Sequence, residues 1–233
     1  MSRFAAILWD CDGVLIDSEI IACGVMVEHF NSCGYHIDLE DFLVRFMGKN
    51  FRRICDEIAA ESGIDIASTF DVAVYKAEQY AAFESKLQAT EGIADFLASL
   101  DVPVAVASGS ELQRLHLTLD VTKLRSFFGD HIYSADMVAN GKPAPDIFLH
   151  AASELDVQPE DCLVIEDGIH GIHGAKAAGM EVWAYLGASH MSPRVRADVL
   201  AAKPDRAFET MDELAAAFAE RQGKRLIAQA FVA

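Results

Sequence analysis

The hydrophobic and polar residues of the chain follow two different patterns. From residue 90 onward, short apolar runs alternate with segments in which apolar residues recur every three or four positions. Apolar runs bounded by turn residues predict buried strands, and the three-to-four spacing predicts helices. Alternation of the two predicts a parallel sheet covered by helices on both faces.

The predicted strands are 4–9, 102–107, 131–134, 162–165, 181–185 and a short one near Ala207. The predicted helices between them are 92–100, 111–119, 146–154, 171–178 and one that begins at Thr210. Thr210 and Glu213 have the spacing of a capping box, which supports that last helix start.

Residues 17–89 interrupt the alternation with helical spacing and almost no strand pattern. Four helices are expected here, at 18–34, 39–46, 50–63 and 69–87. Asn50 is a good N-cap residue, and Gly63 is a good stop. The pattern predicts an α/β core, residues 1–16 and 90–233, with a four-helix cap domain, residues 17–89, inserted after the first strand.

The composition indicates a folded protein and argues against membrane-spanning, nucleic-acid-binding and disulfide-rich classes. Hydrophobic residues make up 52% of the 233 residues, which is enough for a substantial core, and no apolar run approaches the length of a membrane span. The net charge of −17 argues against a nucleic-acid-binding surface. Five cysteines without CxxC spacing, and no N-terminal signal pattern, indicate reduced thiols in a cytoplasmic protein.

Candidate chemistry begins where the first apolar run ends, at Asp10 and Asp12. Residues two apart in an extended chain point the same way, so these carboxylates are expected to face one small volume. Like charges at that separation need a cation between them or a proton on one of them. Gly13 allows a sharp turn directly after the pair.

Further polar residues follow other predicted strands. Ser108 ends the strand at 102–107, and Glu166 and Asp167 follow the strand at 162–165. Ligands bind at the carboxyl ends of strands in parallel sheets, so these residues are expected to share a site with the acid pair.

Four motifs in this order resemble the haloacid dehalogenase-like superfamily, in its phosphatase and phosphomutase branch with a helical cap. The motifs are Asp10-Cys-Asp12-Gly-Val-Leu-Ile-Asp17-Ser18, then Ser108, then Lys142 in Gly-Lys-Pro-Ala-Pro-Asp, then Glu166-Asp167 with Gly171 and residues 177–180. The resemblance covers nearly the whole chain. It implies a Rossmann-like, doubly wound parallel sheet with the helical cap described above.

The resemblance also implies catalytic roles. Asp10 is expected to be the nucleophile that forms an aspartyl-phosphate, and Asp12 the general acid and base. Ser108 and Lys142 are expected to bind the phosphoryl group.

The resemblance further implies a Mg²⁺ ion. Its expected ligands are Asp10, Asp167 and the backbone carbonyl of Asp12, with Glu166 as a further ligand or as a partner of the ligands. The backbone N–H groups of Cys11, Asp12 and Gly109 complete the expected phosphate site.

Three function classes remain after this comparison. Asp12, Glu166 and Asp167 argue against dehalogenation, which leaves a phosphatase as the main hypothesis. The alternative is a β-phosphoglucomutase-type mutase. Ala22, Phe51 and Glu111 depart from the mutase pattern, whereas Ser110 matches a mutase residue that contacts the non-reacting phosphate. A non-catalytic binding protein is the third class. Gly168 stands where the family usually has a Ser that supports the metal site, so the resemblance leaves the metal affinity open.

The cap is expected to select the substrate. Its basic segment 45–53 contains Arg45, Lys49 and Arg52, and Lys76 is a fourth candidate. A basic pocket suits a sugar-acid phosphate or a bisphosphate; the alternative is a solvated helix start. The pattern is similar to that of bacterial 6-phosphogluconate phosphatases. The expected partner is a small phosphorylated metabolite, such as a sugar phosphate, rather than nucleic acid or membrane; monomer and homodimer both remain open.

Overall fold

The computed structural model describes residues 4–47 and 49–223. The chain divides into two compact units. One comprises the segments Met1–Asp17 and Gln88–Ala233, and is called here the α/β unit. The other, Ser18–Leu87, is called the helical unit.

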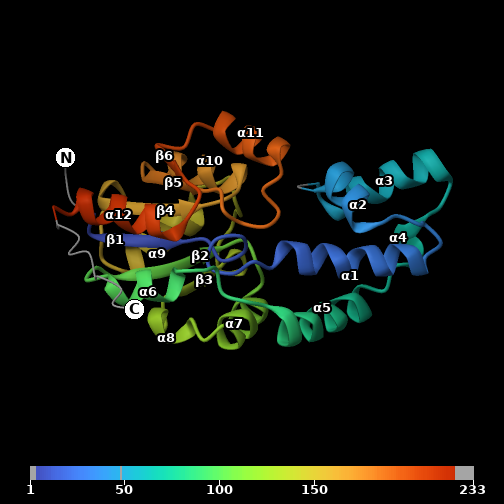
Figure 1. Ribbon diagram of the computed structural model, residues 1–233, viewed down its shortest axis with the longest axis horizontal. Coiled ribbons are helices and arrows are strands. Elements are labelled where there is room, and N and C mark those ends of the chain that lie inside the picture. Colours follow the sequence, from blue (N-terminus) through green and yellow to red (C-terminus); the bar gives the residue numbers. More distant parts are fainter. Residues whose placement is uncertain (1–3, 48, 224–233) are drawn as a thin grey trace, which may run out of the picture. The chain divides into compact units, whose positions relative to one another are not determined.

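The α/β unit is built on one six-stranded sheet whose order is β3-β2-β1-β4-β5-β6 (Figure 1). The strands are β1 (Ala6–Trp9), β2 (Val104–Ser108), β3 (Ile132–Ser134), β4 (Cys162–Glu166), β5 (Glu181–Tyr185) and β6 (Arg206–Phe208). All neighbouring pairs are parallel. The predicted parallel α/β sheet is therefore confirmed, and β1 lies inside it.

Helices and single turns connect the strands, and one helix, α12, follows the last strand. They are α6 (Ile93–Ser99), α7 (Leu112–Val121), α8 (Arg125–Phe128), η1 (Ala135–Met137), α9 (Asp146–Glu154), η2 (Pro159–Asp161), α10 (Ile169–Ala177), α11 (Pro193–Ala201) and α12 (Met211–Arg221). The predicted capping box between Thr210 and Glu213 is present. The sequence interpretation did not include α11, although Ser192 caps it and Pro193 opens it.

Helices cover both faces of the sheet (Figure 1). On one face, the Trp9 ring packs edge-on against Phe96 of α6, with ring centroids 5.5 Å apart. On the other, Ala6 and Leu8 join a buried cluster that includes Phe148 of α9. Successive strand residues point to opposite faces, so β1, with all four residues buried, contributes to both halves of the core.

The register of β1 with its two neighbouring strands sets the position of Asp10. Trp9 is level with Val106 of β2 and with Ile165 of β4. The backbone N–H of Asp10 donates to the carbonyl of Ile165 at 2.9 Å. Asp10 and Glu166 therefore each come one residue after a paired position, on neighbouring strands.

The helical unit contains α1 (Glu19–Ser32), α2 (Leu39–Phe46), α3 (Phe51–Ser62), α4 (Ile66–Thr69) and α5 (Val72–Lys86). Phe30, Phe42 and Phe46 pack in its buried core. The four expected helices are present, and the structure adds a fifth, the one-turn α4, between α3 and α5. The last expected helix, α5, begins at Val72 rather than at Thr69. The reason is local, because the Asp65 and Asp71 side chains each accept backbone N–H groups and start separate helices.

Among the described helices, none has both the length and the apolar content needed to cross a membrane.

Candidate active site

A buried lysine joins two of the predicted site carboxylates. Nζ of Lys142 lies 2.6 Å from Oδ1 of Asp10 and 2.6 Å from Oε1 of Glu166. The three side chains come from the loop before α9, the residue after β1 and the end of β4. They are only 10%, 11% and 3% exposed for Lys142, Asp10 and Glu166 respectively. The structure thus brings together residues that are more than a hundred positions apart in the chain.

Asp167 adds a third carboxylate to this cluster. One oxygen from each of Asp10, Glu166 and Asp167 lies within 4.8 Å of the other two. No other group of three or more acidic, His or Cys side chains within residues 4–47 and 49–223 meets this geometry. On its other side, Oδ2 of Asp167 lies 3.2 Å from Nε2 of His190, a residue that the sequence analysis did not single out.

Burial dominates the electrostatics of this cluster. It raises the pKa of Asp10 to about 7, with the charges of Glu166 and Asp12 adding to the effect and Lys142 opposing it. Burial likewise raises the pKa of Glu166 and of Asp167. Burial disfavours the ammonium group of Lys142, but the charges of Asp10 and Glu166 outweigh this, and its pKa is raised.

The donor set fits a hard divalent cation. Three carboxyl groups and one ammonium group share a buried place, so with all of them ionised the cluster would carry more negative than positive charge. Carboxylate oxygens are the ligands that Mg²⁺ and similar ions prefer, and an ion between them would offset the mutual repulsion.

The loop after β1 turns tightly against the cluster. Gly13 has φ = +77°, a conformation that other residues rarely adopt. A Cβ atom built on it would lie 1.9 Å from Oδ2 of Asp167, so a side chain here would displace that carboxylate. Cys11, between the two acids, is fully buried, and its carbonyl accepts from the N–H of Leu15 at 2.9 Å.

Asp12 is held by side chains of the segment that follows β2. Oγ of Ser110 donates to Oδ2 of Asp12 at 2.5 Å, and Nη2 of Arg114 donates to Oδ1 at 2.6 Å. Both carboxylate oxygens are therefore engaged. Arg114, on α7, is a second residue that the sequence analysis did not identify. Its position six residues after Ser108, on the helix that follows the strand, is the only signal that the sequence offers.

The remaining predicted phosphate-binding groups lie at the end of β2. Ser108 is buried, and its Oγ accepts from the N–H of Ser110 at 3.2 Å. A Cβ atom on Gly109 would meet nothing within 4 Å among the described residues, so there is space beside its backbone.

The predicted substrate-binding cations all belong to the helical unit. Arg45 binds both oxygens of Glu61, at 2.6 and 2.7 Å, and its Nη1 donates to the hydroxyl of Tyr35. Lys49 binds Glu57 at 2.6 Å.

Arg52 and Lys76 are both exposed, on α3 and α5 respectively. Arg52 forms no ion pair with any residue that the structure describes. The role of all four cations in substrate binding stays a prediction.

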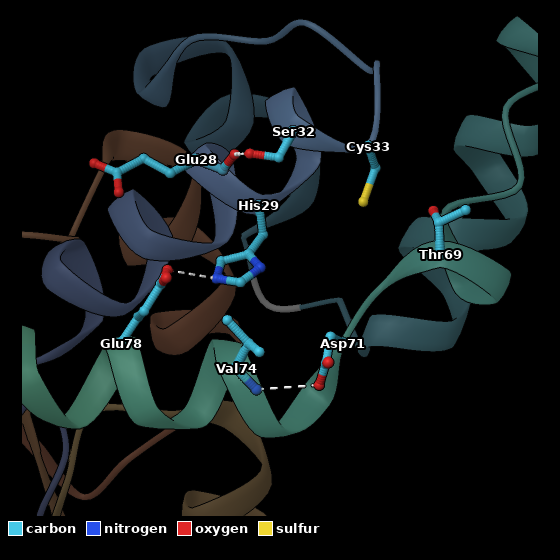
Figure 2. Close-up of a pocket in the computed structure, with 8 residues that line it drawn as sticks. All are labelled: Glu28, His29, Ser32, Cys33, Thr69, Asp71, Val74 and Glu78. Atoms are coloured by element: carbon cyan, nitrogen blue, oxygen red, sulfur yellow. Dashed lines mark hydrogen bonds and ion pairs between the residues drawn. The ribbon is translucent and has the colours of Figure 1, made fainter.

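The helical unit also has a pocket of about 540 Å³, which is formed by none of the predicted site residues (Figure 2). Its lining is Glu28, His29, Ser32, Cys33, Thr69, Asp71, Val74 and Glu78. Nε2 of His29 lies 2.8 Å from Glu78 in this pocket and links α1 to α5. The pocket lacks the clustered carboxylates of the α/β unit.

Comparison with known proteins shows which family the chain belongs to. Residues 4–179 match the model of the haloacid dehalogenase-like hydrolases. The 6-phosphogluconate phosphatase of Escherichia coli is 32% identical over 199 residues, which cover 85% of this chain and 90% of that protein. The fructose-1-phosphate phosphatase of the same species is 32% identical over 187 residues, covering 77% of this chain and 95% of the relative.

A solved structure shares the fold. The crystal structure of a haloacid dehalogenase-like protein from Agrobacterium tumefaciens superposes with a TM-score of 0.83 at 36% identity, covering 93% of this chain and 98% of the other. Because the family model matches residues 4–179, which include β1 to β4, the helical unit and the site residues from Asp10 to Asp167, the chain belongs to the haloacid dehalogenase-like hydrolases.

Proposed function

We propose that this protein is a Mg²⁺-dependent phosphatase that hydrolyses a small phosphorylated metabolite through an aspartyl-phosphate on Asp10. The observation that carries the proposal is the buried cluster in which Lys142 binds Asp10 and Glu166 while Asp167 lies close by. A carboxylate held at the carboxyl end of a central strand, beside positive charge, is suited to attack a phosphoryl group.

The proposed reaction has two displacement steps. A carboxylate oxygen of Asp10 attacks phosphorus, and the bond from phosphorus to the leaving oxygen breaks while Asp12 donates a proton to that oxygen. Water then attacks the phosphorus of the aspartyl-phosphate and gives a proton to Asp12, which releases inorganic phosphate and restores Asp10. Atoms and protons therefore balance over one turnover.

Other residues are proposed to stabilise the negative charge on the phosphoryl oxygens. Lys142 already contacts Asp10, and its ammonium group would offset negative charge on the phosphoryl oxygens. The Ser108 hydroxyl and the backbone N–H groups of Cys11, Asp12 and Gly109 are proposed to donate hydrogen bonds to the same oxygens.

Asp10, Glu166 and Asp167, with the backbone carbonyl of Asp12, are proposed to hold Mg²⁺. The ion supplies the positive charge that lets an anionic nucleophile approach an anionic phosphate.

We infer that the substrate is a sugar phosphate or a sugar-acid phosphate. The curated relatives named above act, by name, on one of each kind, 6-phosphogluconate and fructose 1-phosphate. The exposed cations Arg52 and Lys76 of the helical unit favour the charged sugar acid, whereas Arg45 and Lys49, also predicted for this role, would have to leave Glu61 and Glu57 to bind it. A cytoplasmic location is inferred as well, because all five cysteines have free thiols.

The test is phosphate release from a panel of metabolites, measured with Mg²⁺ and with EDTA. The panel contains 6-phosphogluconate, fructose 1-phosphate, other hexose phosphates, phosphoglycolate and β-glucose 1-phosphate. Metal-dependent release that favours 6-phosphogluconate is the expected result. Formation of glucose 6-phosphate from β-glucose 1-phosphate without phosphate release would identify a mutase instead, and no turnover of any compound would favour the binding-protein hypothesis.

The variant Asp10→Asn tests the nucleophile. It is expected to fold and to lose nearly all activity. A matched control is Asp120→Asn, which removes a surface carboxylate paired with Arg125 and should leave turnover unchanged. Substantial Mg²⁺-dependent turnover by the Asp10 variant would contradict the assignment.

A further inference from the structure

The loop between β5 and α11 is held in place at both of its ends. The N–H of Leu186 donates to the carbonyl of Phe208 at 2.7 Å, next to β6. The N–H of Met191 closes a turn onto the carbonyl of Ala188 at 3.0 Å. Ser192 then caps α11. The loop therefore has a defined path over the carboxyl ends of the strands, where a side chain can be placed accurately.

One side chain of this loop reaches the carboxylate cluster. Nε2 of His190 lies 3.2 Å from Oδ2 of Asp167, and the two side chains are 7% and 10% exposed respectively. A Cβ atom on Gly13 would lie 1.9 Å from that same oxygen and 2.9 Å from Cε1 of His190. The imidazole, the carboxylate and the glycine backbone are thus in close contact, which leaves the carboxylate little freedom to turn.

The three clustered carboxylates are held in different ways. Lys142 binds both Asp10 and Glu166. The second oxygen of Glu166 accepts the N–H groups of Asp167 and Gly168, at 3.0 and 2.9 Å. Among the described residues, the carboxylate of Asp167 has one hydrogen-bonding or ion-pairing side chain, and that is His190.

The residue before His190 fixes the loop to the first motif. Oγ of Ser189 donates to Oδ1 of Asp17 at 2.8 Å, and the N–H of Ser189 lies 3.3 Å from Oδ2. Asp17 is the last residue of the first segment of the α/β unit. Two adjacent residues of one loop therefore hold Asp167 and Asp17.

We propose that His190 is a positioning residue for the metal ligand Asp167, and that Ser189 keeps the imidazole in place through Asp17. The inference rests on the metal site of the proposed function and adds a residue to it. In this proposal His190 acts through the carboxylate, because its Nε2 atom points to the carboxylate oxygen and His190 is not among the three side chains that form the candidate metal group. Residues that hold metal-ligating groups in this way typically change metal affinity by about 10- to 100-fold when they are removed.

The test measures Mn²⁺ binding to the whole protein, by the loss of the electron paramagnetic resonance signal of free Mn²⁺. His190→Ala is expected to raise the Mn²⁺ dissociation constant by about 10- to 100-fold. His190→Gln retains an N–H donor at a similar reach and is expected to recover most of the affinity. The matched control is His173→Ala, which removes an exposed histidine of α10 and should bind as the wild type does.

The outcomes separate this inference from the proposed function. Wild-type affinity in His190→Ala would overturn the role of His190 and leave the metal site standing. Absence of Mn²⁺ binding to the wild type would overturn the metal site and this inference together. Coupling of bound Mn²⁺ to a nitrogen nucleus that disappears in His190→Gln would make His190 a ligand, and would also overturn the positioning role.

Ser189→Ala gives an independent check of the loop. It is expected to weaken Mn²⁺ binding in the wild-type background and to add nothing in the His190→Ala background, because it acts through the imidazole. Additive effects of the two substitutions would contradict the proposed link.

Discussion

Nη2 of Arg114 donates a hydrogen bond to Oδ1 of Asp12 at 2.6 Å across 102 residues of sequence. The guanidinium group comes from α7, and the carboxylate from the loop after β1. Asp12 is the proposed general acid and base, so the position of its oxygens decides how well it reaches the leaving group.

Arg114→Ala is expected to lower kcat/KM for a sugar phosphate, which covers the steps up to release of the leaving group, by about 10- to 100-fold, a part of what a general acid contributes. The effect on p-nitrophenyl phosphate should be smaller, because nitrophenolate leaves without needing a proton. Arg114→Lys keeps the charge with a different geometry, so its activity should lie between those of the wild type and Arg114→Ala. Steady-state kinetics with both substrates measures kcat/KM, and equal losses of kcat/KM on both would mean that Arg114 does not act through Asp12 as the general acid.

Lys142→Met removes the ammonium group between Asp10 and Glu166 and leaves buried carboxylates unbalanced. Loss of one partner from a buried ion pair typically costs about 3–5 kcal/mol of unfolding free energy. That loss should be largest in EDTA and smaller with Mg²⁺, since the ion would offset the same charges. Denaturant unfolding under the two conditions measures it.

The control for Lys142 is Lys49→Met in the helical unit. Lys49 also pairs with a glutamate, but Glu57 is 37% exposed, so the expected cost is much smaller than that of Lys142→Met and does not depend on Mg²⁺. A Lys142 variant that unfolds identically with Mg²⁺ and with EDTA would argue against a cation in the cluster.

The sheet and its acidic residues could be predicted because the signals are local. An apolar run ends at Asp10 and another at Glu166, and parallel pairing then places both at one edge of the sheet. The limits of the strands were less accurate. The second strand begins at Val104 and not at Val102, because Pro103 has no N–H to donate and contributes only its carbonyl to Ile7.

The partners of the acids could not be predicted in this way. Arg114 and His190 are ordinary polar residues in the sequence, and only the folded chain shows that they contact Asp12 and Asp167. The same holds for the cations of the helical unit. Arg45 stood out in a basic segment, but its partner Glu61 lies 16 residues further on, so their pairing is also a tertiary feature.

The pair formed by Arg45 and Glu61 predicts a pH dependence of stability. The hydrogen bond from Arg45 lowers the pKa of Glu61 in the folded protein. The contribution of the pair is therefore present above the unfolded pKa, which is about 4.3, and is lost as the pH falls through the lower folded value. Glu61→Gln should flatten the decline of Tm below about pH 4.3, relative to the wild type.

Thermal unfolding between neutral and acidic pH checks this expectation. The control is Glu84→Gln on α5, an exposed glutamate outside any ion pair in the described part of the chain, and it should retain the wild-type slope. Parallel curves for Glu61→Gln and the wild type would show that the pair contributes nothing to folding.

Two helical glycines provide a last test of how closely the metal site is packed. A Cβ atom on Gly171 would lie 1.6 Å from Oε1 of Glu166, the oxygen that Lys142 binds, whereas one on Gly24 would meet nothing within 4 Å among the described residues. Gly171→Ala should displace the Glu166 carboxylate, cost about 1–3 kcal/mol of stability and weaken Mn²⁺ binding. Gly24→Ala should stabilise α1 by about 0.5–1 kcal/mol and leave Mn²⁺ binding unchanged. Denaturant unfolding and Mn²⁺ titration of both variants measure the contrast, and equal Mn²⁺ affinities would show that the position of Glu166 does not control the metal site.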